Sequence, residues 1–238
     1  MPTILIDGDL LLYQVAVAVE EPIHWGNDWW SLTADLNQAK QMLQHRIEEW
    51  ETKTECNKNL VALSDPSHNW RKDIYEPYKG NRKGKRKPVV YNPLREWLES
   101  EYPTACFKNL EADDVLGILQ TDRTIIASDD KDMMSIPGWL YQPMHDKITW
   151  IDKEEADRNH LIQTLSGDRT DNYPGCPKVG PVTARKILEE NTWDEVVGAY
   201  EKAGLSEEVA LTQARVARIL RAAEWNAITE EVKLWSPA

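Results

Sequence analysis

Short β-branched apolar runs alternate with amphipathic helical segments along roughly the first 150 residues. The first run, Thr3 to Ile6, leads into a helical segment at 10–19, and the same order then repeats. Strands that alternate with helices favour an α/β fold with a mostly parallel central sheet flanked by helices. The expected strands are 3–6, 60–63, 105–107, 124–127, 139–141 and 148–151, with helices around 36–50, 94–98 and 115–119.

The pattern changes after Asp152, where strand signals stop. Helical segments then follow one another at 184–190, 193–203 and 206–225. We therefore expect an α/β body at 1–155 and a helical C-terminal part at 156–238.

Carboxylates gather where the expected strands end. In an open parallel sheet the carboxyl ends of the strands face one crevice, so acids from four separate strands should meet there. Several carboxylates stay ionised close together only when a cation compensates them, because like charges raise one another's pKa. The acids at these ends are Asp7, Asp65, Glu111, Asp113, Asp114, Asp130 and Asp132.

The donor set of this acidic centre predicts the kind of ion. It contains only oxygen ligands, which favour Mg²⁺ or Mn²⁺ over zinc. A later motif, Gly167 to Asn172, adds Asp168 and Asp171. These acids exceed the needs of one Mg²⁺ and indicate two ions bridged by a substrate phosphate.

One segment is strongly basic. Residues 69–87, the basic segment, hold eight Lys or Arg against two acidic residues, although the whole chain carries a net charge of -12. Such a run is either a solvated loop or a contact for a polyanion. The net charge by itself argues against a polyanionic partner. Part of the negative charge, however, belongs to the acids at the strand ends, which bound cations would partly neutralise, so attraction for nucleic acid would be confined to a few basic places.

A glycine-containing turn lies before the helix that starts at Pro181. Gly175 and Gly180 flank Lys178, and Arg185 and Lys186 follow in the helix. Exposed amides and basic side chains in this pattern predict contacts with the phosphates of a duplex backbone. Pro181 stands where a P-loop would have its lysine, which excludes an ATP site.

Composition limits the class of protein. The chain has 238 residues, 41% of them hydrophobic, which is enough for a sizeable core. Its three cysteines lack metal-ligand spacing and favour a reducing compartment, so we expect a cytoplasmic protein. We recognise neither a signal peptide nor a membrane anchor, and expect no membrane partner.

Seven short motifs together resemble the flap-endonuclease/5′-nuclease superfamily, and are most similar to the stand-alone 5′-to-3′ exonucleases of T-odd coliphages. They occur in register across about residues 3–190. The motifs are Asp7-Gly8, Asp65, Tyr78-Lys79-Gly80-Asn81-Arg82, Glu111-Ala112-Asp113-Asp114, Asp130-Lys131-Asp132, Gly167-Asp168-x-x-Asp171 and the turn and helix at 175–188.

The resemblance implies a fold and a function. The fold would be PIN/5′-nuclease-like, with a catalytic core at 1–155, a basic arch at about 69–90, and a DNA-binding part at 156–238 containing a helix-three-turn-helix at about 160–190. The activity would be two-metal 5′-to-3′ exonuclease action on duplex DNA. Flap cleavage and removal of RNA from RNA/DNA hybrids would accompany it, in phage replication within the host cytoplasm and beside other replication proteins.

The resemblance also implies residue roles. The first metal would use Asp7 with the acids at 111, 113, 114, 130 and 132, the second would use Asp168 and Asp171, and Asp65 would act from an outer shell. The catalytic residues would be Lys79, Arg82, Asp113 and Asp114, with Lys79 and Arg82 contacting the scissile phosphate. A K⁺ ion would bind at the 175–180 turn. The implied nucleic-acid contacts are Arg71, Lys72, Tyr78, which would stack on the terminal base, Lys79, Arg82, Lys83, Gly175, Lys178, Gly180, Arg185 and Lys186.

Two alternatives and one departure stay open. A PIN-like ribonuclease would share the acidic sheet but lack the basic segment and the turn at 175–188, and a non-catalytic nucleic-acid-binding module would lack some of the acids. Asp9 stands where many relatives have a neutral residue. We favour a helix-capping role for Asp9 over membership of the metal shell.

Overall fold

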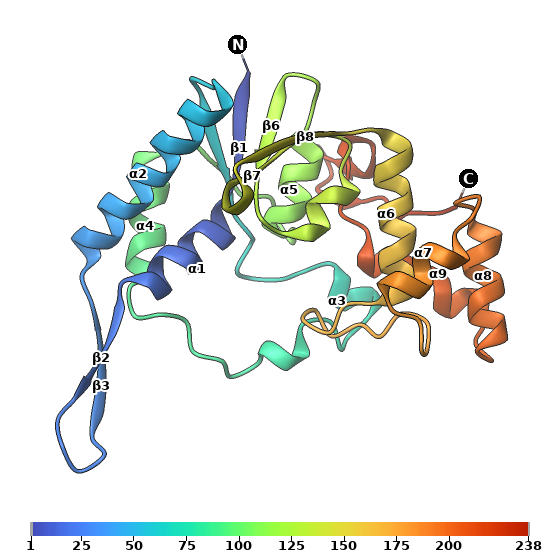
Figure 1. Ribbon diagram of the computed structural model, residues 1–238, viewed down its shortest axis with the longest axis horizontal. Helices are drawn as coiled ribbons and strands as arrows, with labels where there is room; N and C mark the ends of the chain where they lie inside the picture. Colours follow the sequence, from blue (N-terminus) through green and yellow to red (C-terminus); the bar gives the residue numbers. More distant parts are fainter. Residues whose placement is uncertain (1, 238) are drawn as a thin grey trace.

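A six-stranded sheet forms the centre of the protein, in a computed structural model that describes residues 2–237 (Figure 1). The strand order is β5-β4-β1-β6-β7-β8, and all neighbours are parallel except β7 and β8. The strands are β1 (Thr3–Asp7), β4 (Asn59–Ala62), β5 (Thr104–Ala105), β6 (Thr124–Ala127), β7 (Gly138–Gln142) and β8 (Lys147–Ile151). The predicted mostly parallel α/β sheet is confirmed.

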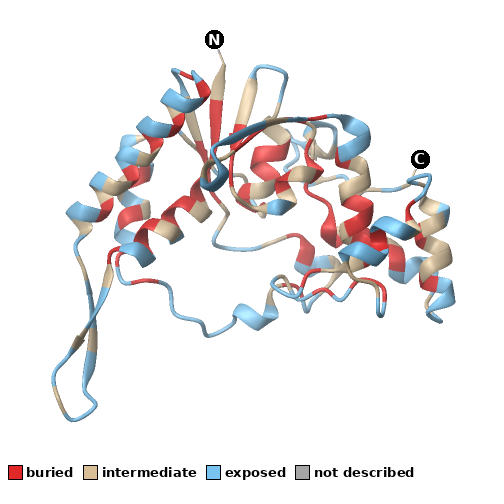
Figure 2. Cartoon of the chain, viewed as in Figure 1, coloured by how far each residue is buried: buried red, intermediate tan, exposed pale blue. Residues whose placement is uncertain are grey.

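Helices cover both faces of this sheet, and β1 shows why. Its alternate residues Ile4 and Ile6 join one buried cluster, while Leu5 between them joins another, as the two-residue repeat of a strand requires. The first cluster packs under α1 (Gly8–Ala18), α2 (Leu36–Thr54) and α4 (Tyr91–Glu101), and the second under α5 (Ala112–Leu119). Figure 2 shows both clusters as buried segments on either side of the strands.

The C-terminal part is helical and has a cluster of its own, to which Leu165, Leu188 and Tyr200 belong. The chain then returns to the α/β body, where Ile219 and Leu220 pack into the cluster under α5. The elements are α6 (Lys153–Ser166), α7 (Pro181–Ile187), α8 (Trp193–Lys202), α9 (Glu207–Ala217) and a small hairpin of β9 (Trp225–Asn226) and β10 (Glu231–Val232). Within residues 2–237, no helix combines the length and the apolar character needed to cross a membrane.

The last helix is shorter than predicted and ends at Ala217 instead of continuing to Trp225. The buried guanidinium of Arg71 takes the carbonyls of Val216 and Arg218 as acceptors, at 2.9 and 2.6 Å. Asp114 accepts from the amide of Leu220 at 3.1 Å. The backbone beyond Ala217 therefore bonds to distant side chains and not to another helical turn. The small hairpin β9–β10 also contradicts the expectation of helices alone after Asp152.

A second hairpin, β2 (Glu20–His24) with β3 (Trp30–Ala34), was not predicted. Both of its faces carry exposed residues, so its sequence lacks the apolar alternation that marks a half-buried strand. Figure 1 shows it projecting from the end of α1, away from the sheet.

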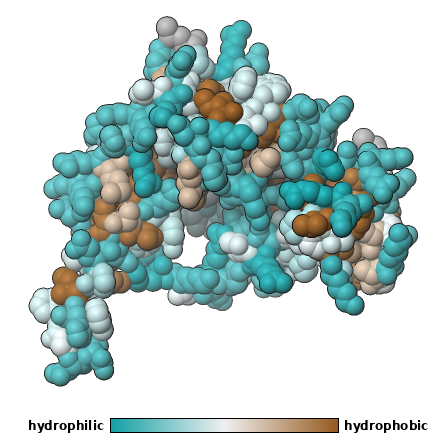
Figure 3. Space-filling view, in the orientation of Figure 1, coloured by the Kyte–Doolittle hydropathy of each residue, from teal (hydrophilic) through white to brown (hydrophobic). Residues whose placement is uncertain are grey.

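The basic segment crosses the molecule below α1 (Figure 1). It contains α3 (Arg71–Ile74) and the 3-10 helix η1 (Gly80–Arg82), after which residues 83–88 lead to α4 without regular structure apart from turns. Figure 3 shows its outer surface as strongly hydrophilic. The other 3-10 helices are η2 (Lys131–Ser135), η3 (Pro143–His145) and η4 (Ala222–Glu224).

Two helical glycines give opposite predictions for stability. A Cβ at Gly117 would lie 2.3 Å from the carbonyl oxygen of Leu220, whereas a Cβ at Gly198 would meet no atom within 4 Å. We expect Gly117→Ala to lower the free energy of unfolding by about 1–3 kcal/mol through overpacking. Gly198→Ala should raise it by about 0.5–1 kcal/mol. Urea denaturation measures both, and equal shifts would contradict the packing of α5 against residues 219–220.

Candidate metal centre

Asp7 lies at the carboxyl end of the central strand β1, in a buried position. Its carboxylate is 4% exposed and caps α1, because Oδ1 accepts from the amide of Leu10 at 3.0 Å. Oδ2 accepts from the hydroxyl of Ser128, which follows the neighbouring strand β6, at 2.8 Å. Burial, opposed by these hydrogen bonds and reinforced by Asp9 and Asp130, raises the pKa of Asp7 to about 6.

Asp113 and Asp130 face Asp7 from two other elements. Asp113 lies in the first turn of α5, and Asp130 caps η2. Burial, together with the charges of Asp7, Asp130 and Glu111, raises the pKa of Asp113 well above its ordinary value, although Lys79 opposes this. Three carboxylates on different elements therefore repel one another at one place, and a cation would relieve that repulsion.

A second acidic group adjoins the first. Burial and the charges of Asp130, Asp168 and Asp171 raise the pKa of Asp132 to about 7 against the opposing charge of Lys131. Gln163 of α6 donates to Asp132 at 2.5 Å, and Lys131 Nζ lies 2.8 Å from Asp168. The structure thus brings seven of the nine predicted acids together, in two adjoining groups: Asp7, Glu111, Asp113, Asp130, Asp132, Asp168 and Asp171.

Two basic side chains of the basic segment contact these acids. Lys79 forms an ion pair with Glu111, and its Nζ lies 3.5 Å from Asp171. Arg82 pairs with Asp171 at 2.6 Å. Although burial opposes ionisation, Lys79 and Arg71 lower the pKa of Glu111 to about 2. Lys79 and Arg82 are therefore positioned to interact with a phosphate that approaches the same carboxylates.

Tyr78 does not offer a ring for base stacking. It is 3% exposed, and the single proton of its hydroxyl is shared between Glu111, at 2.8 Å, and Asp171, at 3.0 Å. The prediction that Tyr78 stacks on a terminal base conflicts with this burial. Its hydroxyl instead holds two acids of the centre in place.

Arg71 and Asp114 form a buried pair outside the open part of the centre. Two guanidinium nitrogens of Arg71 bond the two oxygens of Asp114, each at 2.7 Å, and Asp114 also accepts from the indole of Trp70 at 3.0 Å. Arg71 is 2% exposed and Asp114 is fully buried. We predicted that Arg71 contacts nucleic acid and that Asp114 binds metal. The structure disagrees with both predictions, because the two buried side chains bond to each other.

Asp65 lies apart from the two groups. Its oxygens accept from the amide and hydroxyl of Ser67, at 2.9 and 2.7 Å, and from the amide of Asn109, at 2.7 Å. These hydrogen bonds lower the pKa of Asp65. The carboxylate organises its own loop.

Asp9 does not cap α1, so the capping interpretation was wrong; the cap is Asp7. One oxygen of Asp9 is buried and has no hydrogen-bond partner within the described part of the chain. This orphaned oxygen and the mutual repulsion of Asp7, Asp113 and Asp130 fit a divalent cation.

The side chains do not yet form a coordination shell. Among residues 2–237, no three His, Cys, Asp or Glu side chains converge closely enough to hold an ion as they lie. Three of the acids, Glu111, Asp171 and Asp168, are paired with Lys79, Arg82 and Lys131.

Sequence reasoning missed three partners of the acids: Ser128, Lys131 and Gln163. Lys131 could have been identified from the sequence, because it lies between two predicted ligands, Asp130 and Asp132. Gln163 carries no local signal, since it comes from a different part of the chain.

The predicted nucleic-acid contacts outside the centre are on the surface. Lys72 and Lys83 of the basic segment and Lys178, Arg185 and Lys186 around the glycine turn are exposed. Gly175 has a φ of 63° and approaches Gly167 so closely that its Cβ would lie 2.3 Å from that amide nitrogen. The turn between α6 and α7 is thus closed by backbone contact, while Gly180 remains in open space.

Comparison with known proteins agrees with this geometry. Residues 2–165 match the 5′-3′ exonuclease N-terminal resolvase-like domain. The chain is 32% identical to the exodeoxyribonuclease of Enterobacteria phage T3 over 98% of this chain and 92% of that protein, and 31% identical to the exonuclease of Escherichia phage T7 over 98% and 93%. Among solved structures, the T5 5′-exonuclease with bound zinc matches 90% of this chain and 88% of that one, with a TM-score of 0.70 at 14% identity, and so supports the fold. The resemblance is confirmed, and the chain belongs to the 5′-3′ exonuclease family.

Proposed function

We propose that the protein is a divalent-metal-dependent nuclease that hydrolyses phosphodiester bonds of duplex DNA from the 5′ end. The observation that carries this proposal is that seven carboxylates lie in two adjoining groups at one edge of the sheet, where they influence one another's pKa, with Lys79 and Arg82 paired to two of them. The names of the relatives support it: they include an exodeoxyribonuclease, a 5′-3′ exonuclease and a flap endonuclease. Flap cleavage is therefore included in the proposal.

The acids divide between two ions. Asp7, Asp113 and Asp130 would hold one, with Glu111 beside them, and Asp132, Asp168 and Asp171 the other. The oxygen-only donors favour Mg²⁺, with Mn²⁺ as a substitute. Bound divalent ions would supply an activated water and charge stabilisation at the phosphate. The solved T5 proteins are described with bound metal ions, which supports a divalent metal cofactor. The K⁺ expected at the 175–180 turn stays a prediction.

The cations of the basic segment act on the substrate. Lys79 and Arg82 pair with Glu111 and Asp171, two of the acids of the proposed metal centre, and would donate to a scissile phosphate placed at the same acids. Tyr78 keeps Glu111 and Asp171 in place, since its hydroxyl bonds to both. Asp113 stays open to a cation, whereas the buried Asp114 does not.

The exposed lysines and arginines give the affinity for the nucleic acid. Lys178, Arg185 and Lys186 would contact the duplex backbone, and Lys72 and Lys83 the strand near the centre. Phosphate contacts read no base, so an RNA/DNA hybrid is included as a substrate. Recruitment by replication proteins stays a prediction.

Release of label from a duplex tests the activity. With Mg²⁺ we expect label to be released from the 5′ end of a duplex as short products, and none in EDTA. A duplex labelled at the 3′ end of the same strand is the control for polarity, because it should lose its label last. Equal release in EDTA would contradict metal dependence, and preferential digestion of single-stranded RNA would favour the PIN-like ribonuclease.

Neighbouring acids on α5 should respond differently to removal of their charge. Asp113→Asn should leave the free energy of unfolding unchanged or raise it, because burial disfavours the ionised carboxyl. The same substitution should lower the rate of cleavage by more than the roughly 10–100-fold loss that is typical when a partner of a metal ligand is removed. Asp114→Asn breaks the buried pair with Arg71 and should destabilise the protein by about 3–5 kcal/mol.

Urea denaturation and initial rates on the labelled duplex separate the two effects. A stable Asp114→Asn variant, or an Asp113→Asn variant with full activity, would contradict the assigned roles.

A further inference from the structure

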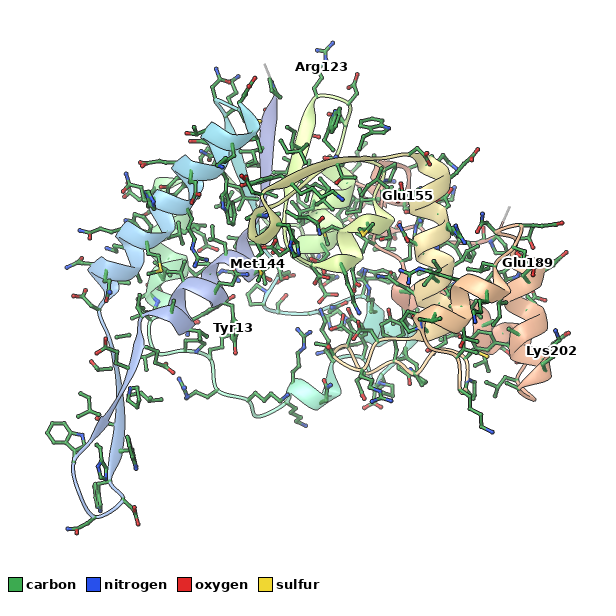
Figure 4. The ribbon with its side chains drawn as sticks, viewed as in Figure 1. Tyr13, Arg123, Met144, Glu155, Glu189 and Lys202 are labelled. Carbon is green, nitrogen blue, oxygen red and sulfur yellow. The ribbon has the colours of Figure 1, made fainter. Side chains whose placement is uncertain are left out.

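The hairpin of β2 and β3, residues 20–34, carries three exposed tryptophans: Trp25, Trp29 and Trp30 are 69%, 74% and 62% exposed. We call it the aromatic hairpin. Its side chains extend from both faces, and Figure 4 shows it standing apart from the rest of the chain. A two-stranded hairpin is marginal in water, and a cluster of exposed indoles marks an interaction site. The aromatic hairpin is therefore expected to be covered by something else.

Two of the rings are held in fixed positions. His24 and Trp30, which are paired across the strands, stack with ring centroids 4.3 Å apart and an angle of 22° between their planes. The indole N–H of Trp25 donates to the hydroxyl of Ser31 at 2.8 Å. One face of Trp30 is thus already stacked on a flat ring, while its remaining surface stays open. The hairpin presents preset flat surfaces.

The root of the aromatic hairpin is joined to the basic segment. Arg86 bonds both carboxylate oxygens of Glu20, each at 2.7 Å, and the amide of Val89 donates to the same carboxylate at 2.8 Å. Lys83 and Lys85 are exposed on the way from Arg82 to this joint. Basic side chains therefore lead from the metal centre to the hairpin.

The charge of the hairpin indicates which part of a ligand meets it. No Lys or Arg occurs between residues 20 and 39, whereas Glu21 and Asp28 are present. Phosphates would be repelled there, but the flat face of an unpaired base stacks well on an indole. A single strand satisfies both surfaces, with its phosphates on the basic segment and its bases on the tryptophans.

We propose that the aromatic hairpin stacks the unpaired bases of a single-stranded 5′ arm, whose backbone crosses the basic segment. This inference rests on the proposed function, because it takes the basic segment as the path of the 5′ strand. It assigns the hairpin to substrates with a 5′ overhang or flap. A blunt duplex would not reach it.

Binding in EDTA tests the proposal without cleavage. Fluorescence anisotropy would compare a blunt duplex with duplexes carrying a single-stranded arm of about 12 nucleotides at the 5′ or the 3′ end. Trp25→Ala/Trp29→Ala should weaken binding of the 5′-tailed duplex by roughly tenfold or more. Binding of the blunt and 3′-tailed duplexes should not change.

Three matched variants define the mechanism. Trp150→Ala removes an exposed indole from β8 and should change nothing. Trp25→Phe/Trp29→Phe should restore most of the affinity, since a phenyl ring also stacks. Lys83→Gln/Lys85→Gln should reduce the salt dependence of binding, while the tryptophan variants should leave it unchanged.

Unchanged affinity of Trp25→Ala/Trp29→Ala for the 5′-tailed duplex would overturn the proposal and leave the hairpin for a protein partner. Equal losses on blunt, 3′-tailed and 5′-tailed duplexes would overturn it as well. Cleavage of blunt duplex by the same variants in Mg²⁺ is measured separately. A wild-type protein that binds the 5′ arm through these tryptophans but cuts nothing would refute the proposed function and leave this inference standing.

Discussion

The buried guanidinium of Arg71 joins three parts of the chain that are far apart in sequence. All five of its N–H groups are used: three bond to Glu111, just before α5, and to Asp114 on α5, and two bond to the carbonyls of Val216 and Arg218. Arg71 itself lies near the start of the basic segment, residues 69–87. Such a charge is tolerated inside a protein only when every donor is satisfied. Arg71 therefore fixes the start of the basic segment against the acidic centre, and Tyr78, Lys79 and Arg82 add contacts further along the segment.

Because Arg71 holds the basic segment beside the acidic centre, positive and negative side chains lie together at this edge of the sheet. Burial, and to a smaller extent the charges of neighbouring acids, raises the pKa values of Asp7, Asp113 and Asp132, so their ionised forms need compensation. Lys79, Arg82 and Lys131 provide part of the compensation. The net charge of -12 is thus compatible with a nucleic-acid substrate, because Glu111, Asp168 and Asp171 are already paired with cations and bound metal would partly neutralise the other acids of the centre.

The order of strands and helices could be predicted because apolar periodicity is local. The gathering of the acids could also be predicted, since parallel strands open at one edge. The pairing of Arg71 with Asp114 could not, because both look like ordinary members of charged motifs until residues 216–220 fold over them. The same placement of residues 216–220 accounts for the burial of Tyr78 and for the early end of α9. The aromatic hairpin was missed because neither of its faces is buried.

The central claim is that these carboxylates hold divalent ions in the folded protein. A cation that binds only the folded state raises its melting temperature in proportion to the logarithm of the free ion concentration above its dissociation constant. Thermal unfolding in a Mg²⁺ titration, with an EDTA reference, measures this for the wild-type protein and for Asp113→Asn. We expect a rising melting temperature for the wild type and a much flatter response for the variant. Identical responses of the two proteins would contradict it.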